Sequence, residues 1–188
     1  MRDIVLKLGL VLCGLCLLVA CGGGKNIPSE PPPAAWKYEE GAITLNLKAL
    51  PELNLYEDTA HTLYLCVYQL SNPNTYKLLS QDEAGLTKLL SCQRLDSTVA
   101  SFQSVILQPG EKKTLLLDRA EGAKYVAVVA GYYQLTPGKV AKLFEIPVVI
   151  EKKGFIKKKI LTKPGTLKVE LLLGPYGIKK VEKEEAKK

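Results

Sequence analysis

Residues 124–133, KYVAVVAGYY, and residues 62–70, TLYLCVYQL, decide the fold class of this 188-residue chain. Both runs are rich in aromatic and β-branched residues, which favour strands. Successive residues in both are apolar, so each strand would present two apolar faces. Runs of this kind are typical of central strands that are covered on both sides. We therefore predict a β-rich domain built around these two strands.

Further strands are indicated on either side of the two central runs. Residues 42–48, AITLNLK, alternate between apolar and polar side chains, as in a strand with one buried face. Additional strands are predicted at residues 102–108, 113–117, 144–151 and 167–173. Pro109-Gly110 predicts a hairpin between the first two of these. Because proline cannot donate a ladder hydrogen bond, Pro147 predicts a sheet edge or a bulge.

A short helix is predicted in an insertion of about residues 75–92. Ser80-Gln81-Asp82-Glu83 has the pattern of a capping box, with Ser80 at the N-cap and Glu83 three residues later. The following leucines have helical spacing, which predicts an amphipathic helix over about 81–91. The expected fold is therefore mainly β: a two-sheet β-sandwich of about 7–8 strands with one short helical insertion.

Residues 17–24, LLVACGGG, bear on where the chain resides. A basic start precedes an apolar run of about 13 residues, which is shorter than the roughly 20 that span a membrane. The pattern is that of a secretory signal. Its end, Leu18-Val19-Ala20-Cys21, resembles the bacterial lipobox, in which the cysteine receives diacylglycerol and the chain is cut before it. The alternative is an ordinary cleaved signal with a chance cysteine.

Four segments follow from this pattern: a lipoprotein signal peptide at 1–20, a flexible Gly/Pro-rich tether at 21–40, a β-sandwich domain at 41–178 and a charged C-terminal tail at 179–188. Gly22, in place of an aspartate, favours the outer membrane by the sorting rule of enteric bacteria. Loss of the signal lowers the formal net charge from +7 to +6. Such a charge suits several partners, but the compartment argues against nucleic acid.

The residues that carry chemistry are few. His61 is the single histidine, and zinc sites require three or four protein ligands, so we predict no metal and a solvated loop histidine. The chain has no nucleophile elbow and no phosphate-binding loop. We predict a non-enzyme with no small-molecule substrate and no cofactor beyond the lipid on Cys21. Cys66 and Cys92 form either a disulfide, which the periplasm permits, or two buried thiols.

Six lysines between Lys152 and Lys163 flank Phe155-Ile156. They mark either a solvated hairpin tip whose charges protect the strand edges, or a patch for anionic lipid headgroups or an acidic partner.

Several segments together resemble one family, the outer-membrane lipoproteins of the type VI secretion system (TssJ or SciN). LYLCVYQLSNPNTYKLL resembles the strand of that family that ends in a Tyr-Gln-Leu motif and leads into a helical insertion. VILQPGEKKTLLL resembles its Pro-Gly hairpin, and KYVAVVAGYYQL its central strand. KLFEIPVVI and PGTLKVELLLGPYGI resemble its two closing strands.

The resemblance implies a transthyretin-like sandwich anchored on the periplasmic face of the outer membrane. It also implies that the loop between the first two strands, Ala49–His61, binds the periplasmic C-terminal region of an inner-membrane TssM-family protein. The expected contact residues are Leu50, Leu53, Leu55, Tyr56, Glu57 and Asp58. The alternative for the leucines is that they fold back on the sandwich, or that residues 53–55 continue a strand. The alternative function is a periplasmic lipoprotein that binds a small ligand or a glycan.

Overall fold

The computed structural model describes residues 33–153 and 159–184. In chain order the elements are β1 (Glu39–Ala49), β2 (Leu63–Leu70), α2 (Asn74–Leu79), α3 (Glu83–Leu90), β3 (Val99–Leu107), β4 (Lys112–Arg119), β5 (Tyr125–Ala130), β6 (Ala141–Glu145), β7 (Val148–Lys153), β8 (Lys159–Pro164), β9 (Leu167–Leu173) and β10 (Ile178–Glu184). The strands form two four-stranded sheets, in the orders β10-β9-β1-β4 and β3-β2-β5-β6, and a β7-β8 pair.

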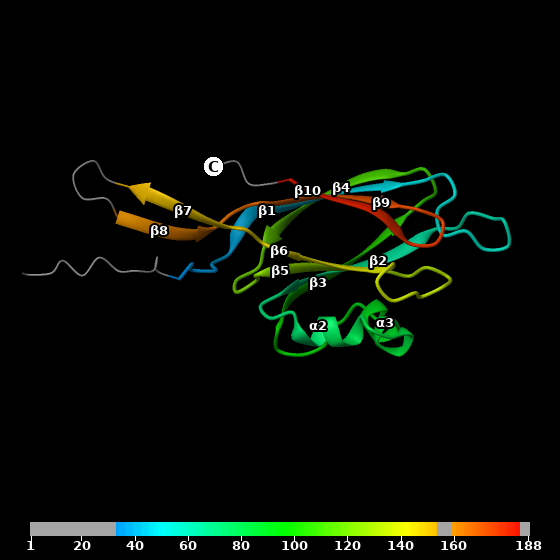
Figure 1. Ribbon diagram of the computed structural model, residues 1–188, viewed down its shortest axis with the longest axis horizontal. Coiled ribbons are helices and arrows are strands. Elements are labelled where there is room, and N and C mark those ends of the chain that lie inside the picture. Colours follow the sequence, from blue (N-terminus) through cyan, green and yellow to red (C-terminus); the bar gives the residue numbers. More distant parts are fainter. Residues whose placement is uncertain (1–32, 154–158, 185–188) are drawn as a thin grey trace, which may run out of the picture. The chain divides into compact units, whose positions relative to one another are not determined.

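The two four-stranded sheets pack face to face, which confirms the predicted sandwich (Figure 1). In β1 the alternation seen in the sequence places Ile43, Leu45 and Leu47 in the core. This strand pairs parallel with β9 and antiparallel with β4. The two helices lie against the outer face of the β3-β2-β5-β6 sheet, so this sheet is covered on both sides.

β2 and β5 are neighbouring central strands, as predicted from their composition. Two successive side chains of β2 form hydrogen bonds on opposite faces of its sheet. The Tyr68 hydroxyl donates to the carbonyl of Leu89 in α3 at 2.6 Å. Next to it, Gln69 points to the other sheet, where its side chain donates to the carbonyl of Asp118 and accepts from the backbone N–H of Ala120, both at 2.8 Å. Tyr68 and Gln69 therefore join the β3-β2-β5-β6 sheet to the helices on one face and to the other sheet on the opposite face.

The hairpin predicted across Pro109-Gly110 is wrong in its pairing. β3 pairs with β2, whereas β4 pairs with β1, so this turn carries the chain from one sheet to the other. Gly110 has a φ of +76°, which suits glycine, and its N–H donates to the carbonyl of Leu50. The turn residues fix the reversal of the chain, but they do not specify which sheet the next strand joins.

The single strand predicted at 144–151 is also wrong, because the chain divides at Ile146-Pro147 into β6 and β7. β6 is an edge strand beside β5, as Pro147 had suggested, but β7 pairs with β8. The hairpin expected around the lysines is therefore present. Its tip, residues 154–158, lies outside the described residues, and so do the side chains of Lys152, Lys153 and Lys159.

The predicted insertion contains two short helices where one was expected, α2 and α3. Ser80 ends α2, and the N-cap of α3 is Asp82, whose carboxylate accepts the N–H of Gly85 at 2.7 Å. Ser80 as N-cap is therefore wrong. A Cβ at Gly85 would lie 2.1 Å from the carbonyl oxygen of Leu79. Glycine is therefore needed at this position, because the end of α2 approaches the first turn of α3 so closely.

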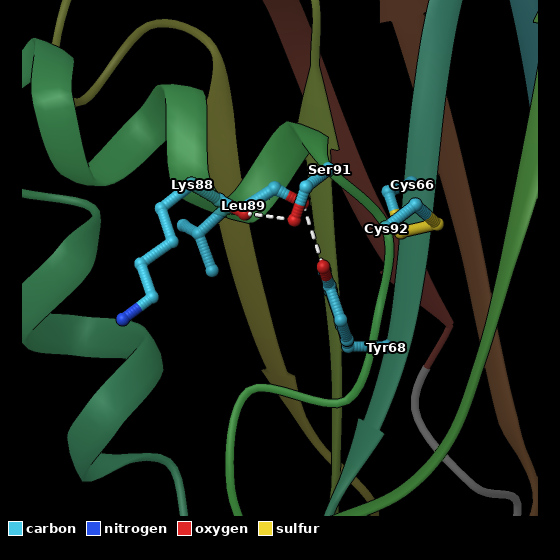
Figure 2. The surroundings of a disulfide bond; sticks show 6 residues. All are labelled: Cys66, Tyr68, Lys88, Leu89, Ser91 and Cys92. Atoms are coloured by element: carbon cyan, nitrogen blue, oxygen red, sulfur yellow. Dashed lines mark hydrogen bonds between the residues drawn. A yellow bond between two sulfur atoms is a disulfide. The ribbon is translucent and has the colours of Figure 1, made fainter.

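A disulfide joins Cys66 of β2 to Cys92, just beyond α3, with Cα atoms 5.5 Å apart (Figure 2). This outcome decides between the two alternatives that the sequence left open. In the same region, the Ser91 hydroxyl donates to the carbonyl of Lys88 at 2.7 Å and closes the end of the helix. The disulfide and the Tyr68 hydrogen bond therefore hold the end of α3 on β2 at two neighbouring points.

Both domain boundaries predicted from sequence need correction. β10 extends the sandwich to Glu184, beyond the boundary expected at 178, because it pairs antiparallel with β9. At the other end, residues 36–40 of the expected tether bind the sandwich. The Arg119 guanidinium donates to the carbonyl of Lys37 and pairs with Glu39, and the Tyr38 hydroxyl donates to Asp118. Cys21 and the signal peptide lie outside the described residues.

Candidate functional site

The connection between β1 and β2, residues 50–62, is the candidate site, and we call it the β1–β2 loop. Its first half runs beside the β9–β10 turn, residues 174–177. The backbone N–H groups of Asn54 and Leu55 donate to the carbonyls of Gly174 and Pro175 at 3.3 and 2.9 Å. In Figure 1 this loop lies at the same end of the sandwich as the β5–β6 connection, residues 131–140. These three segments are contiguous at the end of the sandwich.

Asn54 is the residue that fixes the loop to both neighbours. Its side chain is buried, and its backbone has a φ of +47°, which asparagine tolerates better than most residues. The amide donates to the carbonyl of Thr62 at 3.0 Å and accepts from the N–H of Tyr133 at 2.9 Å. One side chain therefore closes the loop on itself and positions the start of the β5–β6 connection.

The tip of the loop is a tight two-residue turn. Tyr56 and Thr59 exchange two backbone hydrogen bonds of 2.9 Å around Glu57 and Asp58. Both turn residues have positive φ, +47° and +55°, as type I′ turns require. The turn places two carboxylates side by side in solvent, because Glu57 and Asp58 are both exposed.

Three rings pack together behind this turn. Tyr56 lies flat against Tyr133 of the β5–β6 connection, with ring centroids 4.5 Å apart and planes 16° from parallel. His61 meets Tyr133 edge-on at 4.9 Å and Tyr56 at 6.4 Å. The histidine is thus partly buried in an aromatic cluster, and the solvated loop histidine expected from the sequence is wrong.

A cleft of about 410 Å³ opens between the three segments. It is lined by Asn54, Leu55, Tyr56, Glu57, Asp58, Tyr132, Tyr133, Gln134, Pro175 and Tyr176. Three of its tyrosines are about half exposed: Tyr56 at 48%, Tyr133 at 57% and Tyr176 at 56%. Burial raises the pKa of the Tyr132 hydroxyl, so this group stays protonated. The lining is therefore aromatic and acidic, and within the described part of the chain it includes no basic side chain.

The structure separates the six predicted contact residues into three groups. Leu53 is 0% exposed in the core, so it is wrong as an exposed contact, and the alternative of a leucine folded back on the sandwich holds for it. Leu50 and Leu55 are half-buried. Tyr56, Glu57 and Asp58 form the exposed tip. Their contact with a partner stays a prediction.

Sequence reasoning missed three residues of this site: Asn54, Tyr133 and Tyr176. One signal was available, because Tyr132-Tyr133 follows a central strand and two successive side chains there point in opposite directions. Nothing in the sequence indicated that Asn54 would reach Tyr133, which is 79 residues away.

The structure has a further depression besides this cleft. A second depression, of about 460 Å³, lies over β1, β4, β9 and β10 and has mixed polar lining. Within residues 33–153 and 159–184, no three His, Cys, Asp or Glu residues are grouped as metal ligands. No helix in that part of the chain is long and apolar enough to cross a membrane.

The fold defines a class, that of β-sandwich domains with a structured loop at one end. Comparison with known proteins identifies the family. Residues 41–169 match the model of the type VI secretion lipoproteins, T6SS-SciN, a family that includes VasD, EvfM and TssJ. The chain belongs to this family, which confirms the resemblance noted in the sequence. No curated protein matches the chain.

Solved structures show the same fold. The type VI lipoprotein TssJ1 of Pseudomonas aeruginosa is similar with a TM-score of 0.55 and 19% identity, over 83% of this chain and 100% of that chain. Serratia marcescens Lip, a membrane-bound component of the same secretion system, gives 0.53 and 18% over 76% and 96%. A chain in the structure described as "T6SS protein TssM C-terminal domain (869-1107) from EAEC" gives 0.51 and 14% over 77% and 98%.

Proposed function

We propose that this chain is anchored by a lipid on Cys21 to the periplasmic face of the outer membrane. There it docks the periplasmic C-terminal region of an inner-membrane TssM-family protein and so helps to assemble the trans-envelope complex. Membership of the type VI lipoprotein family supports the general role. No catalytic step and no cofactor beyond the lipid is part of the proposal.

The observation that carries the docking role is the construction of the β1–β2 loop. Its base is held by Asn54 and by the buried Leu53, while Tyr56, Glu57 and Asp58 stand exposed at a hydrogen-bonded turn. Aromatic side chains held in one conformation make good binding hot spots, because little conformational entropy is lost on association. The proposed contact set is therefore Tyr56, Glu57 and Asp58, with Leu50 and Leu55 at their base.

The two ends of β1 support the proposal that the anchor and the binding loop lie at separate places on the domain. The Arg119 and Tyr38 contacts fix the chain at the start of β1, and the β1–β2 loop leaves from its other end. A strand of 11 residues at about 3.3 Å per residue separates the two points by roughly 35 Å. A chain tethered at the first point would present the loop away from the membrane.

The anchor is tested by fractionating cells that produce the Cys21→Ser variant. We expect loss of lipid labelling and loss of outer-membrane fractionation, because the thiol that would accept the lipid is gone. Unchanged fractionation would remove the anchor from the proposal.

Docking is tested by calorimetric titration of the lipidated chain in detergent micelles with the periplasmic C-terminal region of the TssM-family protein from the same bacterium. We expect Tyr56→Ala to weaken binding at least tenfold, or about 1.4 kcal/mol, with little change in thermal unfolding. Leu116→Ala, at an exposed leucine of β4, is the matched control and should bind normally. Absence of binding to the unaltered chain would overturn the proposed function.

A further inference from the structure

We propose that the cleft between the β1–β2 loop, the β5–β6 connection and the β9–β10 turn is a receptor for a cationic side chain, an arginine of the docking partner. This inference rests on the proposed function for the identity of the partner. The chemistry of the cleft can be tested without that partner.

The aromatic lining is the first argument. Tyr56, Tyr133 and Tyr176 come from three separate segments, yet all three line one cleft of about 410 Å³ and each keeps about half of its surface in solvent. The face of an aromatic ring carries partial negative charge and attracts a cation placed within about 6 Å. Three such rings at one opening make an attractive environment for a positively charged group.

Charge is the second argument. Glu57 and Asp58 line the same cleft, and no lysine or arginine of residues 33–153 and 159–184 does. The chain without its signal peptide has a formal net charge of +6, so an acidic lining is opposite in sign to the molecule as a whole. The two carboxylates of the cleft therefore attract a cation, although Lys139 and Lys179 line an adjoining depression that shares Tyr176.

The stacking geometry favours arginine over lysine. Tyr56 and Tyr133 lie nearly parallel at 4.5 Å, which leaves no space for a group between them, so the cation would lie against an outer ring face. A planar guanidinium stacks on such a face and can still donate to a carboxylate, whereas an ammonium is a compact, strongly hydrated charge. The two carboxylates of the adjoining turn supply the acceptors.

The cleft is also built before any partner arrives. His61 packs edge-on against Tyr133 and Tyr56, and the Asn54 side chain accepts a hydrogen bond from the N–H of Tyr133 at 2.9 Å. These contacts hold Tyr56 and Tyr133 in place, so binding a cation would not require these two rings to be ordered first.

The first experiment uses a peptide probe and no partner. The lipidated full chain in detergent micelles, labelled with ¹³C at tyrosine, is titrated with acetyl-Gly-Arg-Gly-amide and with the citrulline analogue, which has the same shape without the charge. We expect the arginine peptide to shift the ring signals of Tyr56, Tyr133 and Tyr176 and to bind at least fivefold more tightly than the citrulline peptide. Equal binding of the two peptides, or shifts confined to tyrosines outside the cleft, would overturn the proposal.

A second experiment places the cation in the complex. Each arginine of the partner region is changed to glutamine and titrated against the unaltered chain and against the chain with Glu57→Gln and Asp58→Asn. We expect one arginine whose loss weakens binding at least tenfold with the unaltered chain and less than twofold with the neutralised cleft. The matched control neutralises Glu40 and Glu121, two exposed carboxylates that do not line the cleft.

The outcomes of these experiments separate the two proposals. If every arginine replacement has the same effect on the unaltered and neutralised chains, the cation receptor is wrong although docking stands. If the partner region does not bind at all, the proposed function is wrong, and the peptide titration still decides whether the cleft takes a guanidinium.

Discussion

The β1–β2 loop and the β2–β3 connection, residues 71–98, flank the same central strand but treat their apolar residues differently. The β2–β3 connection turns Tyr76, Leu86 and Leu89 inward, where they are almost completely buried. The β1–β2 loop buries Leu53 alone to that degree and leaves Tyr56 exposed at its tip.

The bonds that hold the two connections differ in the same way. The β2–β3 connection is held by the Cys66–Cys92 disulfide and by tyrosine hydroxyls of Tyr68 and Tyr76 bonded to backbone carbonyls. The loop is held by backbone hydrogen bonds and by the Asn54 amide. The helices complete a layer of the core, so their apolar side chains contribute to stability, whereas the loop buries one leucine fully and leaves Tyr56 exposed.

The largest effect is expected from removing the disulfide. Cys66→Ser with Cys92→Ser opens a bridge between residues 26 apart in sequence, which should lower the free energy of unfolding by about 3 to 4 kcal/mol. Urea denaturation of the oxidised and altered chains measures it. Partner affinity in conditions where the altered chain stays folded should be unchanged, because the bridge lies with the helices. A drop in affinity without a loss of stability would show that the β2–β3 connection, and not only the β1–β2 loop, serves binding.

A smaller effect is expected from shortening the one buried leucine of the loop. Leu53→Ala leaves a cavity in the core and should cost about 3 kcal/mol in the free energy of unfolding. Leu55→Ala, at a half-buried leucine two residues away, is the control and should cost about half as much or less. Equal losses at both positions, measured by denaturation, would mean that Leu53 is not the anchor of the loop.

Asn54 should affect both stability and binding. Asn54→Ala removes both of its side-chain hydrogen bonds at a backbone of positive φ, and we expect a loss of about 2 kcal/mol in stability and weaker partner binding. Asn54→Gly keeps the backbone conformation accessible and should recover part of the stability but not the binding. Normal binding by both variants would show that the loop does not need this amide.

The smallest effect is expected at Tyr68. Tyr68→Phe removes the hydroxyl that donates to Leu89 and should lower stability by about 1 kcal/mol. Because this bond lies in the helical layer, partner affinity should equal that of the unaltered chain. Thermal unfolding and the same titration check both parts, and a tenfold loss of affinity would contradict the separation of the two regions.

Much of the fold could be predicted from the sequence, because the spacing of apolar residues shows which faces of a strand are buried. The central strands at 62–70 and 124–133 and the alternating strand at 42–48 were predicted correctly, since each strand's own side chains show how many of its faces are covered. The errors arose where a choice depended on distant parts of the chain. Pro109-Gly110 marked a reversal, but the sheet that β4 joins depends on pairing with β1, more than sixty residues earlier.

The candidate site was likewise predicted only in part from the sequence. Tyr56, Glu57 and Asp58 were found from the sequence as residues of an exposed connection, but Leu53 in the same stretch is buried. Four apolar residues in a short loop cannot be sorted into buried and exposed without knowing what lies beneath them. Tyr133 and Tyr176 entered the site only because the β5–β6 connection and the β9–β10 turn meet the loop at one end of the sandwich.

The sequence by itself determined the lipoprotein signal pattern, the central strands, the sandwich class and the family, because these follow from local composition and from the order of motifs along the chain. The tertiary structure decided which sheet each strand joins, that Cys66 faces Cys92, that Leu53 is buried and that three tyrosines share an acidic cleft. These are contacts between residues far apart in sequence, and their free energy depends on distances that only the folded chain sets.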